Sequence, residues 1–189
     1  MIMSQARKTN AFLLITMFAF AAVSAESPFD SDTGLRIHHY TDPVPETVPG
    51  GVTLNTEEVA SLLNREDVVS VDVISINDVR YDELDGSWPD YPKRNHIKGS
   101  LWLPNVGYGR PAQDMLKYLI SHTTEAVAGN LEAPVMIYCV SDCWMGWNAV
   151  RHLAKSGFKN LYWYPEGTDG WIQAGYPVVL AEPVPVNVD

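Results

Sequence analysis

The chain has 189 residues, 46% of them hydrophobic and 19% charged, and its formal net charge is -10. This length supplies one domain with an ordinary core and leaves no room for two large ones. The acidic balance argues against a nucleic-acid binder, which needs a basic patch to displace counterions, and against attraction to an anionic membrane surface. We therefore expect a single domain that binds no nucleic acid.

The N-terminus has the pattern of a secretory signal peptide. Arg7 and Lys8 form a positive segment, an apolar run follows from residue 11 to residue 23, and Val23-Ser24-Ala25 supplies a small-x-small cleavage site. The apolar run is too short to span a bilayer easily, although an uncleaved membrane anchor is the alternative. We expect residues 1–25 to be removed and the mature protein to be exported without membrane insertion, to the periplasm in a bacterium with two membranes. That compartment is oxidising.

Residues 26–50 are polar and proline-rich and show no helical periodicity, so we expect an extended N-terminal arm there. After the arm, helical and strand patterns alternate, beginning with a capping box at Asn55 and Glu58. The predicted elements are, in chain order, a helix from Asn55 to Leu63, a strand from Val68 to Ile76, a short strand with a turn at Gly99 from His96 to Pro104, a helix from Gln113 to about Val127, a strand from Pro134 to Cys139, a helix from Met145 to Ser156, a strand from Leu161 to Tyr164 and a short helix from Thr168 to Ala174.

This alternation favours a single α/β domain with a mostly parallel sheet. We place the domain at residues 51–180. Pro183 and Pro185 follow it, so we expect residues 181–189 to form a C-terminal tail.

Cys139 ends a strand of the buried type, and a helix is predicted to begin about six residues later. In open α/β sheets, binding sites form at the carboxyl ends of strands, and helix N-termini favour anions. A thiolate at this position would be stabilised by the helix dipole and by loop amides, which lowers its pKa. Cys139 is thus a candidate nucleophile. The alternative is a small, buried hydrophobic residue at a strand end.

Four segments of the sequence, taken in order, resemble the motifs of rhodanese-like domains. They are residues 96–104, which resemble HIPGAxxIP; Tyr138-Cys139, at the place of the active-site Cys; residues 153–162, which resemble a helix-Gly-strand stretch; and residues 166–178, which resemble GGxxxWxxAGxPV. The resemblance covers roughly Gly51 to Val179. It implies the rhodanese fold, an open parallel sheet flanked by helices.

The cysteine cluster is similar to that of one subgroup of this family. Cys139 and Cys143 form a Cys-x-x-x-Cys-Trp run, and residues 100–105 read Ser-Leu-Trp-Leu-Pro-Asn. Both features resemble exported rhodanese-like proteins that are named for a CXXCW motif and associated with PQQ-dependent catabolism. The resemblance therefore implies a setting in PQQ-dependent oxidation of alcohols or similar compounds.

The loop after Cys139 departs from that of a sulfurtransferase. The family usually places an Arg after Cys and four further residues, whereas this chain has Trp144 there and Asp142 in place of a Gly. An Arg would bind an anionic sulfur donor such as thiosulfate, and a Trp cannot. Asp142 would repel that anion and raise the thiol pKa. A hydrogen bond to a charged group is worth about 1.5–3 kcal/mol, so ordinary thiosulfate sulfurtransferase activity is not expected.

Cys143, four residues after Cys139, leaves several states of the pair open. The two could be a redox-active dithiol, in which Cys143 resolves a persulfide or mixed disulfide on Cys139. They could instead form a structural disulfide, although a ring closed by so few residues contributes only about 2 kcal/mol. Independent thiols or a metal site are the remaining interpretations.

A copper-binding chaperone is the alternative from another functional class, because thiolates suit Cu(I). The histidines that could assist are His38, His39, His96, His122 and His152. His96 lies in the motif that resembles HIPG, where we expect a structural hydrogen bond, and no His is spaced as a convincing ligand to the cysteines. A zinc site needs about four ligands, and none are apparent. We therefore assign no metal and no cofactor.

Aromatic residues are dense around the cysteine loop. Trp144 and Trp147 are three residues apart and share a face near the start of the predicted helix. They form either core packing under the loop or an aromatic wall that excludes water or receives a partner. By resemblance to the family, Asp72 is expected to tie neighbouring loops together.

The sequence thus predicts an exported accessory protein that handles thiols or sulfur in PQQ-dependent oxidation. The expected site residues are Cys139 as nucleophile or persulfide carrier, Cys143 as resolving thiol, and Ser141, Asp142, Trp144 and Met145 as the loop around the thiolate. The backbone amides of residues 141–145 are expected to stabilise that thiolate. A periplasmic quinoprotein dehydrogenase or cytochrome c is the expected partner. The alternative is a non-catalytic module that docks such a partner through a disulfide-held loop.

Overall fold

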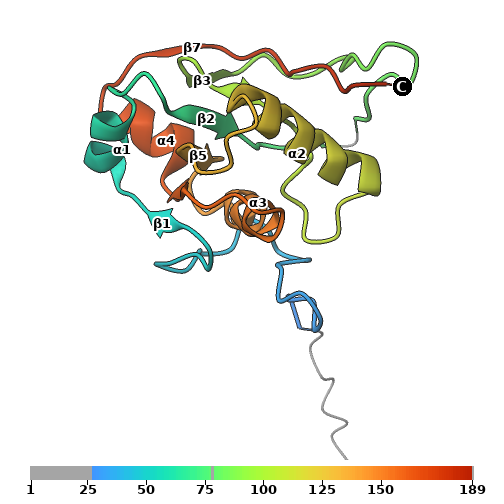
Figure 1. Cartoon of the computed structure of the whole chain (residues 1–189), viewed down its shortest axis with the longest axis horizontal. Coiled ribbons are helices and arrows are strands. Elements are labelled where there is room, and N and C mark those ends of the chain that lie inside the picture. Colours follow the sequence, from blue (N-terminus) through green and yellow to red (C-terminus); the bar gives the residue numbers. More distant parts are fainter. Residues whose placement is uncertain (1–26, 78, 189) are drawn as a thin grey trace, which may run out of the picture.

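A computed structural model describes residues 27–77 and 79–188 (Figure 1), so the expected signal peptide at residues 1–25 lies outside the described residues. In chain order the elements are β1 (Val52–Thr53), α1 (Thr56–Leu62), β2 (Val69–Asp72), β3 (Asn95–Ile97), β4 (Leu101–Trp102), α2 (Gln113–Ala126), β5 (Val135–Tyr138), α3 (Trp144–Lys155), β6 (Leu161–Tyr164), α4 (Gly167–Gln173) and β7 (Val178–Leu180). Within the described residues, no helix has the length and apolar character needed to cross a membrane.

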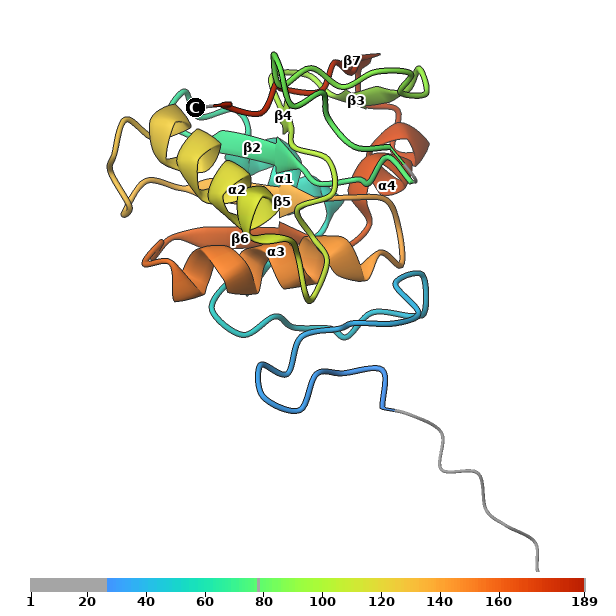
Figure 2. The same cartoon turned by 90° about the vertical axis from the view of Figure 1, so that its right-hand side faces the viewer.

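The main sheet has five strands in the order β1-β6-β5-β2-β4, and every neighbouring pair is parallel. Helices α1 and α4 cover one face, and α2 and α3 cover the other (Figure 1, Figure 2). All four residues of the central strand β5 are therefore buried. This architecture confirms the predicted α/β domain with a mostly parallel sheet.

Alternation along β5 divides the core into two parts. Met136 and Tyr138 pack with residues of α1 and α4, whereas Val135 and Ile137 join the larger cluster under α2 and α3. Cys139, one residue beyond the strand, belongs to the larger cluster. The alternation thus points the cysteine loop toward the face that α3 covers.

Two predicted strands are shorter than their sequence patterns indicate. The strand expected from Val68 to Ile76 ends at Asp72. The Val73 amide still donates to the Tyr138 carbonyl at 2.9 Å, but backbone groups of Ile74 and Ile76 bond to side chains. Trp102 Nε1 donates to the carbonyl of Ile74 at 2.9 Å, and the Ile76 amide donates to Asn105 Oδ1 at 2.9 Å. The segment expected as one strand from 96 to 104 is divided at its turn, since β3 pairs with β7 in a separate antiparallel sheet while β4 joins the main sheet.

Other local predictions agree with the structure. The capping box of α1 is present, with the Glu58 amide donating to Asn55 Oδ1 at 3.0 Å and the Asn55 amide donating to Glu58 Oε2 at 2.9 Å. Strand β6 has the predicted bounds, and α3 differs from its predicted bounds by one residue at each end. These segments combine strong periodicity with clear end signals, which is why their bounds are readable.

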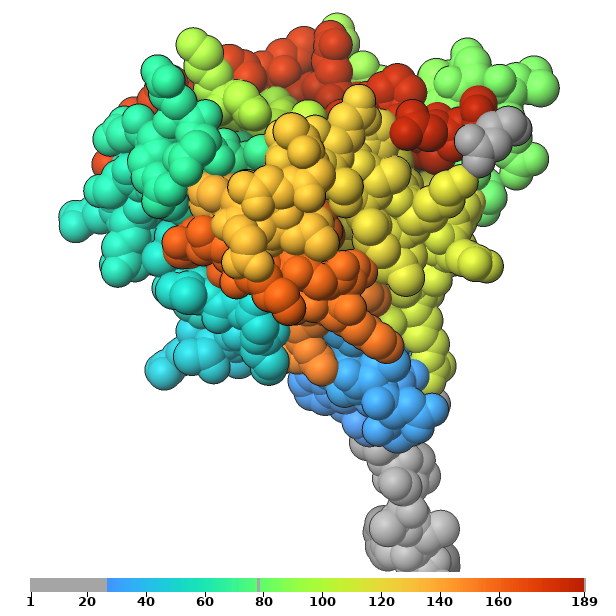
Figure 3. Space-filling model, in the orientation of Figure 1, coloured from blue at the N-terminus to red at the C-terminus, as the bar shows by residue number. Residues whose placement is uncertain are grey.

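The arm, residues 27–50, lies along α3 (Figure 2) and sits against that helix in the space-filling view (Figure 3). It is not extended throughout, because it turns back where Phe29 forms an antiparallel bridge with Arg36. Trp147 Nε1 donates to the carbonyl of Thr47 at 3.1 Å. Asn148 accepts from the Arg36 amide at 3.0 Å and donates to its carbonyl at 2.8 Å. One face of α3 therefore anchors the arm to the domain.

The C-terminal residues 181–188 also lie on the domain. The Val184 amide donates to the carbonyl of Trp102 at 2.9 Å, and the Val186 amide donates to that of Gly86 at 2.8 Å. Pro183 forms a parallel bridge with Trp102. This segment covers β4, the edge strand of the main sheet, which would otherwise present unpaired backbone groups.

Candidate functional site

The two cysteines lie where the central strand passes into a helix. Cys139 follows β5, Cys143 is the N-cap of α3, and the two are joined by a disulfide with their Cα atoms 6.1 Å apart. Cys139 is 2% exposed and Cys143 is 8% exposed. In this state neither cysteine offers a thiolate to a metal or to a sulfur donor. Of the states that the sequence left open, the structure has the disulfide.

The loop between the cysteines is fixed by contacts with α4. Ser141 Oγ donates to the Glu166 carbonyl at 2.9 Å, and the Ser141 amide donates to Asp169 Oδ2 at 3.1 Å. Asp142 adopts a left-handed conformation with φ of 53°, which Asp tolerates better than most residues. The four-residue step from Cys139 to Cys143 thus turns sharply and is held at its outer edge.

Cys139 lies beneath the turn that begins α4. Its carbonyl accepts from the Thr168 amide at 3.0 Å and from Thr168 Oγ1 at 3.3 Å. Gly167 comes so close that a Cβ there would lie 2.3 Å from the same carbonyl oxygen, and its φ is +55°. Only glycine satisfies both conditions. The backbone of Cys139 is therefore covered by the segment that the sequence matched to the family's C-terminal motif.

The expected ring of loop amides is only partly free to meet a thiolate. The Ser141 amide is taken by Asp169, and the Trp144 amide donates to the Tyr40 carbonyl at 2.8 Å. Within the described residues, no side chain hydrogen-bonds to the first turn of α3. Two of the five amides expected to meet a sulfur anion are thus already bonded within the folded chain.

Trp144, at the position of the family's arginine, anchors the arm. Its Nε1 donates to the Asp42 carbonyl at 3.0 Å, and its ring makes edge contacts with Phe29 and Trp147 at centroid distances of 5.3 and 5.2 Å. The side chain is buried. The first of the two interpretations, packing under the loop, describes this contact.

A cation does lie beside Trp144, and it comes from the arm. The Arg36 guanidinium stands 4.7 Å from the Trp144 ring centroid. Its Nε donates to the His38 carbonyl at 2.6 Å, and its Nη2 donates to the His39 carbonyl at 2.9 Å and to the Asp42 carboxylate. Because the guanidinium already donates to these acceptors within the arm, Arg36 does not replace the missing loop arginine as an anion ligand.

Asp72 ties the end of β2 to the loop that carries Arg94, in keeping with the expected loop-tying role. Its fully buried carboxylate accepts from Arg94 Nη1 and from the Ile74 amide, the latter at 3.1 Å. Arg94 Nη2 reaches Thr168 Oγ1 at 3.4 Å, which extends the network to the turn over Cys139. His96 Nδ1 lies 3.7 Å from Asp72 and has no hydrogen-bond partner among the described residues, so the structural hydrogen bond expected for it is not made.

Tyr138, which precedes Cys139, is buried on the face of the sheet that α1 and α4 cover. Its hydroxyl donates to Ser100 Oγ at 2.8 Å and accepts from the Ile97 amide at 3.1 Å. Burial raises the pKa of Tyr138 well above its usual value, and the nearby carboxylate of Asp72 adds to the effect. The phenol therefore stays protonated and supports the strand end structurally.

The outer surface of the loop carries carboxylates. Asp142 lies in the loop, Asp169 accepts from the Ser141 amide at 3.1 Å, and both are exposed. Glu166 is also exposed, but its carboxylate accepts from Thr56 Oγ1 at the start of α1. An anionic donor that approached the disulfide would be repelled by Asp142 and Asp169. The sequence identified Asp142; Glu166 and Asp169 belong to the quoted segment 166–178 but carried no separate signal.

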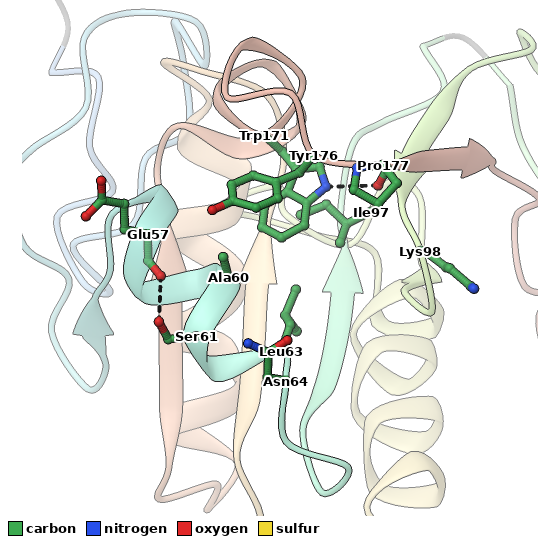
Figure 4. Close-up of a pocket in the computed structure, with 10 residues that line it drawn as sticks. All are labelled: Glu57, Ala60, Ser61, Leu63, Asn64, Ile97, Lys98, Trp171, Tyr176 and Pro177. Atoms are coloured by element: carbon green, nitrogen blue, oxygen red, sulfur yellow. Dashed lines mark hydrogen bonds between the residues drawn. The ribbon is translucent and has the colours of Figure 1, made fainter.

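A surface cavity of about 610 Å³ lies on the other face of the domain, between α1, β3 and the end of α4 (Figure 4). Its wall includes Trp171 and Tyr176, whose rings stack at a centroid distance of 4.4 Å, while Trp171 Nε1 donates to the Pro177 carbonyl at 3.0 Å. Neither cysteine lines this cavity or any of four others formed by described residues. The disulfide is therefore not set in one of these cavities.

Sequence reasoning missed the residues that the arm brings to α3. Arg36, Tyr40 and Asp42 belong to a stretch without periodicity, and nothing in their spacing indicates that they contact Trp144. Among the described residues, no group of three or more His, Cys, Asp or Glu side chains is arranged to hold a metal ion.

Comparison with solved structures finds sulfur-transfer proteins at low identity. A thiosulfate sulfurtransferase from Pseudomonas aeruginosa is 22% identical, with a TM-score of 0.47, over 68% of this chain and 20% of that one. The polysulfide-sulfur transferase homodimer of Wolinella succinogenes is 17% identical, with a TM-score of 0.41, over 69% and 79% of the two chains. A 3-mercaptopyruvate sulfurtransferase from Leishmania major is 15% identical, with a TM-score of 0.46, over 76% and 39%. The chain thus spans about a fifth of the Pseudomonas protein.

Family membership depends on a different comparison. No protein of curated function matches the chain. A family model described as "Rhodanese-like domain" matches residues 55–174, which is more than half of the chain and includes every strand of the main sheet except β1. The matched segment contains the parallel sheet, the cysteine loop and the turn over Cys139. The chain therefore belongs to the family of rhodanese-like domains.

Proposed function

We propose that this rhodanese-like protein is an exported thiol–disulfide exchange protein whose reactive bond is Cys139–Cys143. The observation that carries the proposal is the disulfide itself, which joins the family's cysteine position to the N-cap of α3. A helix N-terminus stabilises the thiolate of a cysteine placed there and so lowers the pKa of its thiol. An oxidising compartment, as the N-terminal sequence predicts, would keep such a pair able to accept electrons.

The proposed reaction is balanced by a substrate dithiol. A substrate thiolate attacks one sulfur of the disulfide; a mixed disulfide forms, the Cys139–Cys143 bond breaks, and the other cysteine leaves as a thiolate and takes up a proton. The second substrate thiol then attacks its own sulfur in the mixed disulfide and releases the protein. The substrate loses two electrons and two protons, and the protein gains them as a dithiol.

Three features favour this reaction over sulfur transfer from an anionic donor. The thiol that would carry a persulfide is already bonded to Cys143. Trp144 occupies the position of the donor-binding arginine and is committed to the arm. The exposed Asp142 lies in the loop, and the exposed carboxylate of Asp169 contacts it. A persulfide on Cys139 would require prior reduction of the disulfide. Sulfur handling could therefore only follow the exchange reaction.

The deciding experiment is the reduction potential of the pair, measured by thiol trapping of the mature protein across a series of redox buffers. A potential within about -120 to -270 mV, the span of catalytic dithiols, supports exchange. A potential well below about -300 mV is typical of structural disulfides and would contradict the proposal. The Cys143→Ser variant, which has one thiol and no internal disulfide, calibrates the trapping reaction.

The second candidate function is a binding module with a structural disulfide. The observation that favours it is burial, since neither cysteine is more than 8% exposed. In that case the disulfide holds the loop in shape. Reduction of the disulfide should then weaken partner binding. A potential below the catalytic span, together with partner binding that depends on the disulfide, would support this candidate instead.

The biological setting of the proposal comes from the resemblance to the CXXCW subgroup. On that ground we propose that the protein acts in the periplasm beside PQQ-dependent oxidation, with a quinoprotein dehydrogenase or a cytochrome c as its partner. Two measurements test this setting. N-terminal sequencing of the exported protein should begin at residue 26. A purified quinoprotein dehydrogenase should exchange thiols with the protein faster than an unrelated dithiol protein does, and equal rates would contradict the assignment.

A further inference from the structure

We infer that Cys143, and not the family cysteine Cys139, is the sulfur that exchanges with the external thiol. This inference rests on the proposed function and specifies which atom of the disulfide reacts. It reverses the roles that the sequence predicts, in which Cys139 is the nucleophile and Cys143 resolves. The argument uses the burial of each cysteine and the backbone that surrounds it.

Access favours Cys143. Thiol–disulfide exchange requires the incoming sulfur to approach the attacked sulfur directly, so the rate depends on how open that sulfur is. Cys143 is 8% exposed and follows two exposed residues, Ser141 and Asp142, whereas Cys139 is 2% exposed. Cys139 is also covered by Gly167 and Thr168, which contact its carbonyl from the start of α4.

The helix favours the same cysteine. Cys143 is the N-cap of α3, a helix of 12 residues, and no described side chain caps its first turn. A side-chain anion at the N-cap accepts hydrogen bonds from the amides of the second and third helical residues, here Met145 and Gly146. The Cys143 thiolate would therefore be stabilised when the disulfide opens. Cys139 follows β5 and is not itself the N-cap of a helix.

Leaving-group chemistry opposes this assignment and has to be weighed. The better stabilised thiolate is also the better leaving group, which would favour attack on Cys139 with departure of Cys143. That preference operates only if the attacking thiolate can reach the sulfur of Cys139. The turn at Gly167 and Thr168 packs on the main chain of Cys139, and the residue as a whole is 2% exposed against 8% for Cys143. Access therefore decides in favour of Cys143.

The reaction then has a defined order. The external thiolate bonds to Cys143 Sγ, the Cys139–Cys143 bond breaks, and Cys139 leaves as a thiolate and is protonated. In the opposite direction the Cys143 thiolate attacks the substrate disulfide, and the Cys139 thiolate resolves the mixed disulfide on Cys143 by re-forming the internal bond. Electrons and protons balance as in the proposed function, with a dithiol as the co-reactant.

The test compares the single-cysteine variants Cys139→Ser and Cys143→Ser, each checked for native folding by circular dichroism. Both react with 2,2′-dithiodipyridine, an uncharged disulfide probe. The thiol of Cys143 in Cys139→Ser is expected to react at least tenfold faster than the thiol of Cys139 in Cys143→Ser. Equal rates, or a faster Cys139, would overturn the inference. Each variant is the matched control of the other.

The wild-type chain supplies a second measurement that holds even if a variant fails to fold. Brief treatment with 2-mercaptoethanol, acid quenching, alkylation and peptide mass spectrometry locate the first mixed disulfide. An adduct mainly on Cys143 supports the inference, and one mainly on Cys139 contradicts it. Failure of the proposed function would be seen in a different measurement. A disulfide that resists reduction across the catalytic range of redox buffers would contradict that function, whichever cysteine carries the adduct.

Discussion

The carboxylate of Asp72 shows how a single residue supports the site without touching it. Asp72 is fully buried at the end of β2, pairs with Arg94 and accepts from the Ile74 amide. Arg94 in turn reaches Thr168, whose amide and hydroxyl hold the carbonyl of Cys139. A buried ion pair contributes little relative to an apolar pair, but breaking it leaves an uncompensated charge.

Replacing Asp72 should therefore be costly. We expect Asp72→Ala to lower the free energy of unfolding by about 3–5 kcal/mol, because Arg94 loses its partner in a largely buried position. Urea unfolding measures the change. The control is Arg65→Ala, which breaks the exposed pair of Arg65 and Asp67 and should cost far less than Asp72→Ala. Equal costs for the two variants would show that the Asp72 network is not structurally important.

At the scale of elements, the contact between the arm and α3 joins the N-terminal residues to the domain. Asn148 is fully buried and bonds to both backbone groups of Arg36, and its Nδ2 also donates to the Gly107 carbonyl at 2.9 Å. This amide joins three segments that are distant in sequence. Because the same face of α3 carries Trp144, the arm also fixes the residue that follows Cys143.

The arm should depend on this amide. Asn148→Leu leaves three buried backbone groups without partners, each at a cost of about 1–3 kcal/mol unless the arm moves away. We expect the variant to lose at least about 2 kcal/mol of stability and to show faster hydrogen exchange in residues 27–50. Arg151→Ala is the control, since Arg151 holds Thr33 and Gly34 of the same arm from a more exposed position. Unchanged exchange in Asn148→Leu would mean that the arm is held elsewhere.

The elements themselves were largely predictable, and the contacts between them were not. The helix from 113, the capping box at Asn55 and the strand from 161 to 164 follow from periodicity and end signals. The position of Cys139 at a strand end followed in the same way. The arm could not be placed, because its contacts with Trp144 and Asn148 depend on backbone carbonyls that any sequence would supply. The free amides of the loop were also overestimated, since Asp169 and Tyr40 compete for them only in the folded chain.

For the molecule as a whole, two histidines, the buried His152 and the half-buried His122, predict how stability depends on pH. Burial lowers the pKa of His152, although its ring nitrogen contacts the Tyr108 carbonyl at 2.9 Å, and burial also lowers the pKa of His122. Each imidazole is therefore harder to protonate in the folded chain than in the unfolded one. The unfolded state binds more protons below about pH 6.5, so stability is fully present above that value and is lost as the pH falls through it.

We accordingly expect the free energy of unfolding to decrease between pH 7 and pH 5, by up to about 1.4 kcal/mol per pH unit for each histidine. Carboxylates with lowered pKa values, such as Asp114, act only below about pH 4 and leave this window clear. His152→Gln should reduce the slope. Ser156→Ala, which removes a hydroxyl that donates to the His152 carbonyl at 2.9 Å, should lower stability without changing the slope. A slope that is the same in His152→Gln and in the wild type would contradict the assignment.

The net charge of -10 and the carboxylates around the loop predict which thiols the disulfide meets fastest. A field of one sign changes association rates by about 10- to 1,000-fold at low salt, and the effect fades as the Debye length shrinks to about 3 Å at 1 M. We expect 2-aminoethanethiol, a cation, to reduce the Cys139–Cys143 disulfide at least tenfold faster than 2-mercaptoethanesulfonate at low ionic strength, after correction for the thiolate fraction of each. As the salt concentration rises, this ratio of the two reduction rates should approach the ratio that the same two thiols give with a small uncharged disulfide.

Asp142→Asn and Asp169→Asn should each reduce the ratio of the two rates at low salt, because each removes a negative charge beside the loop. A ratio insensitive to salt would show that the surface charge does not select the thiol.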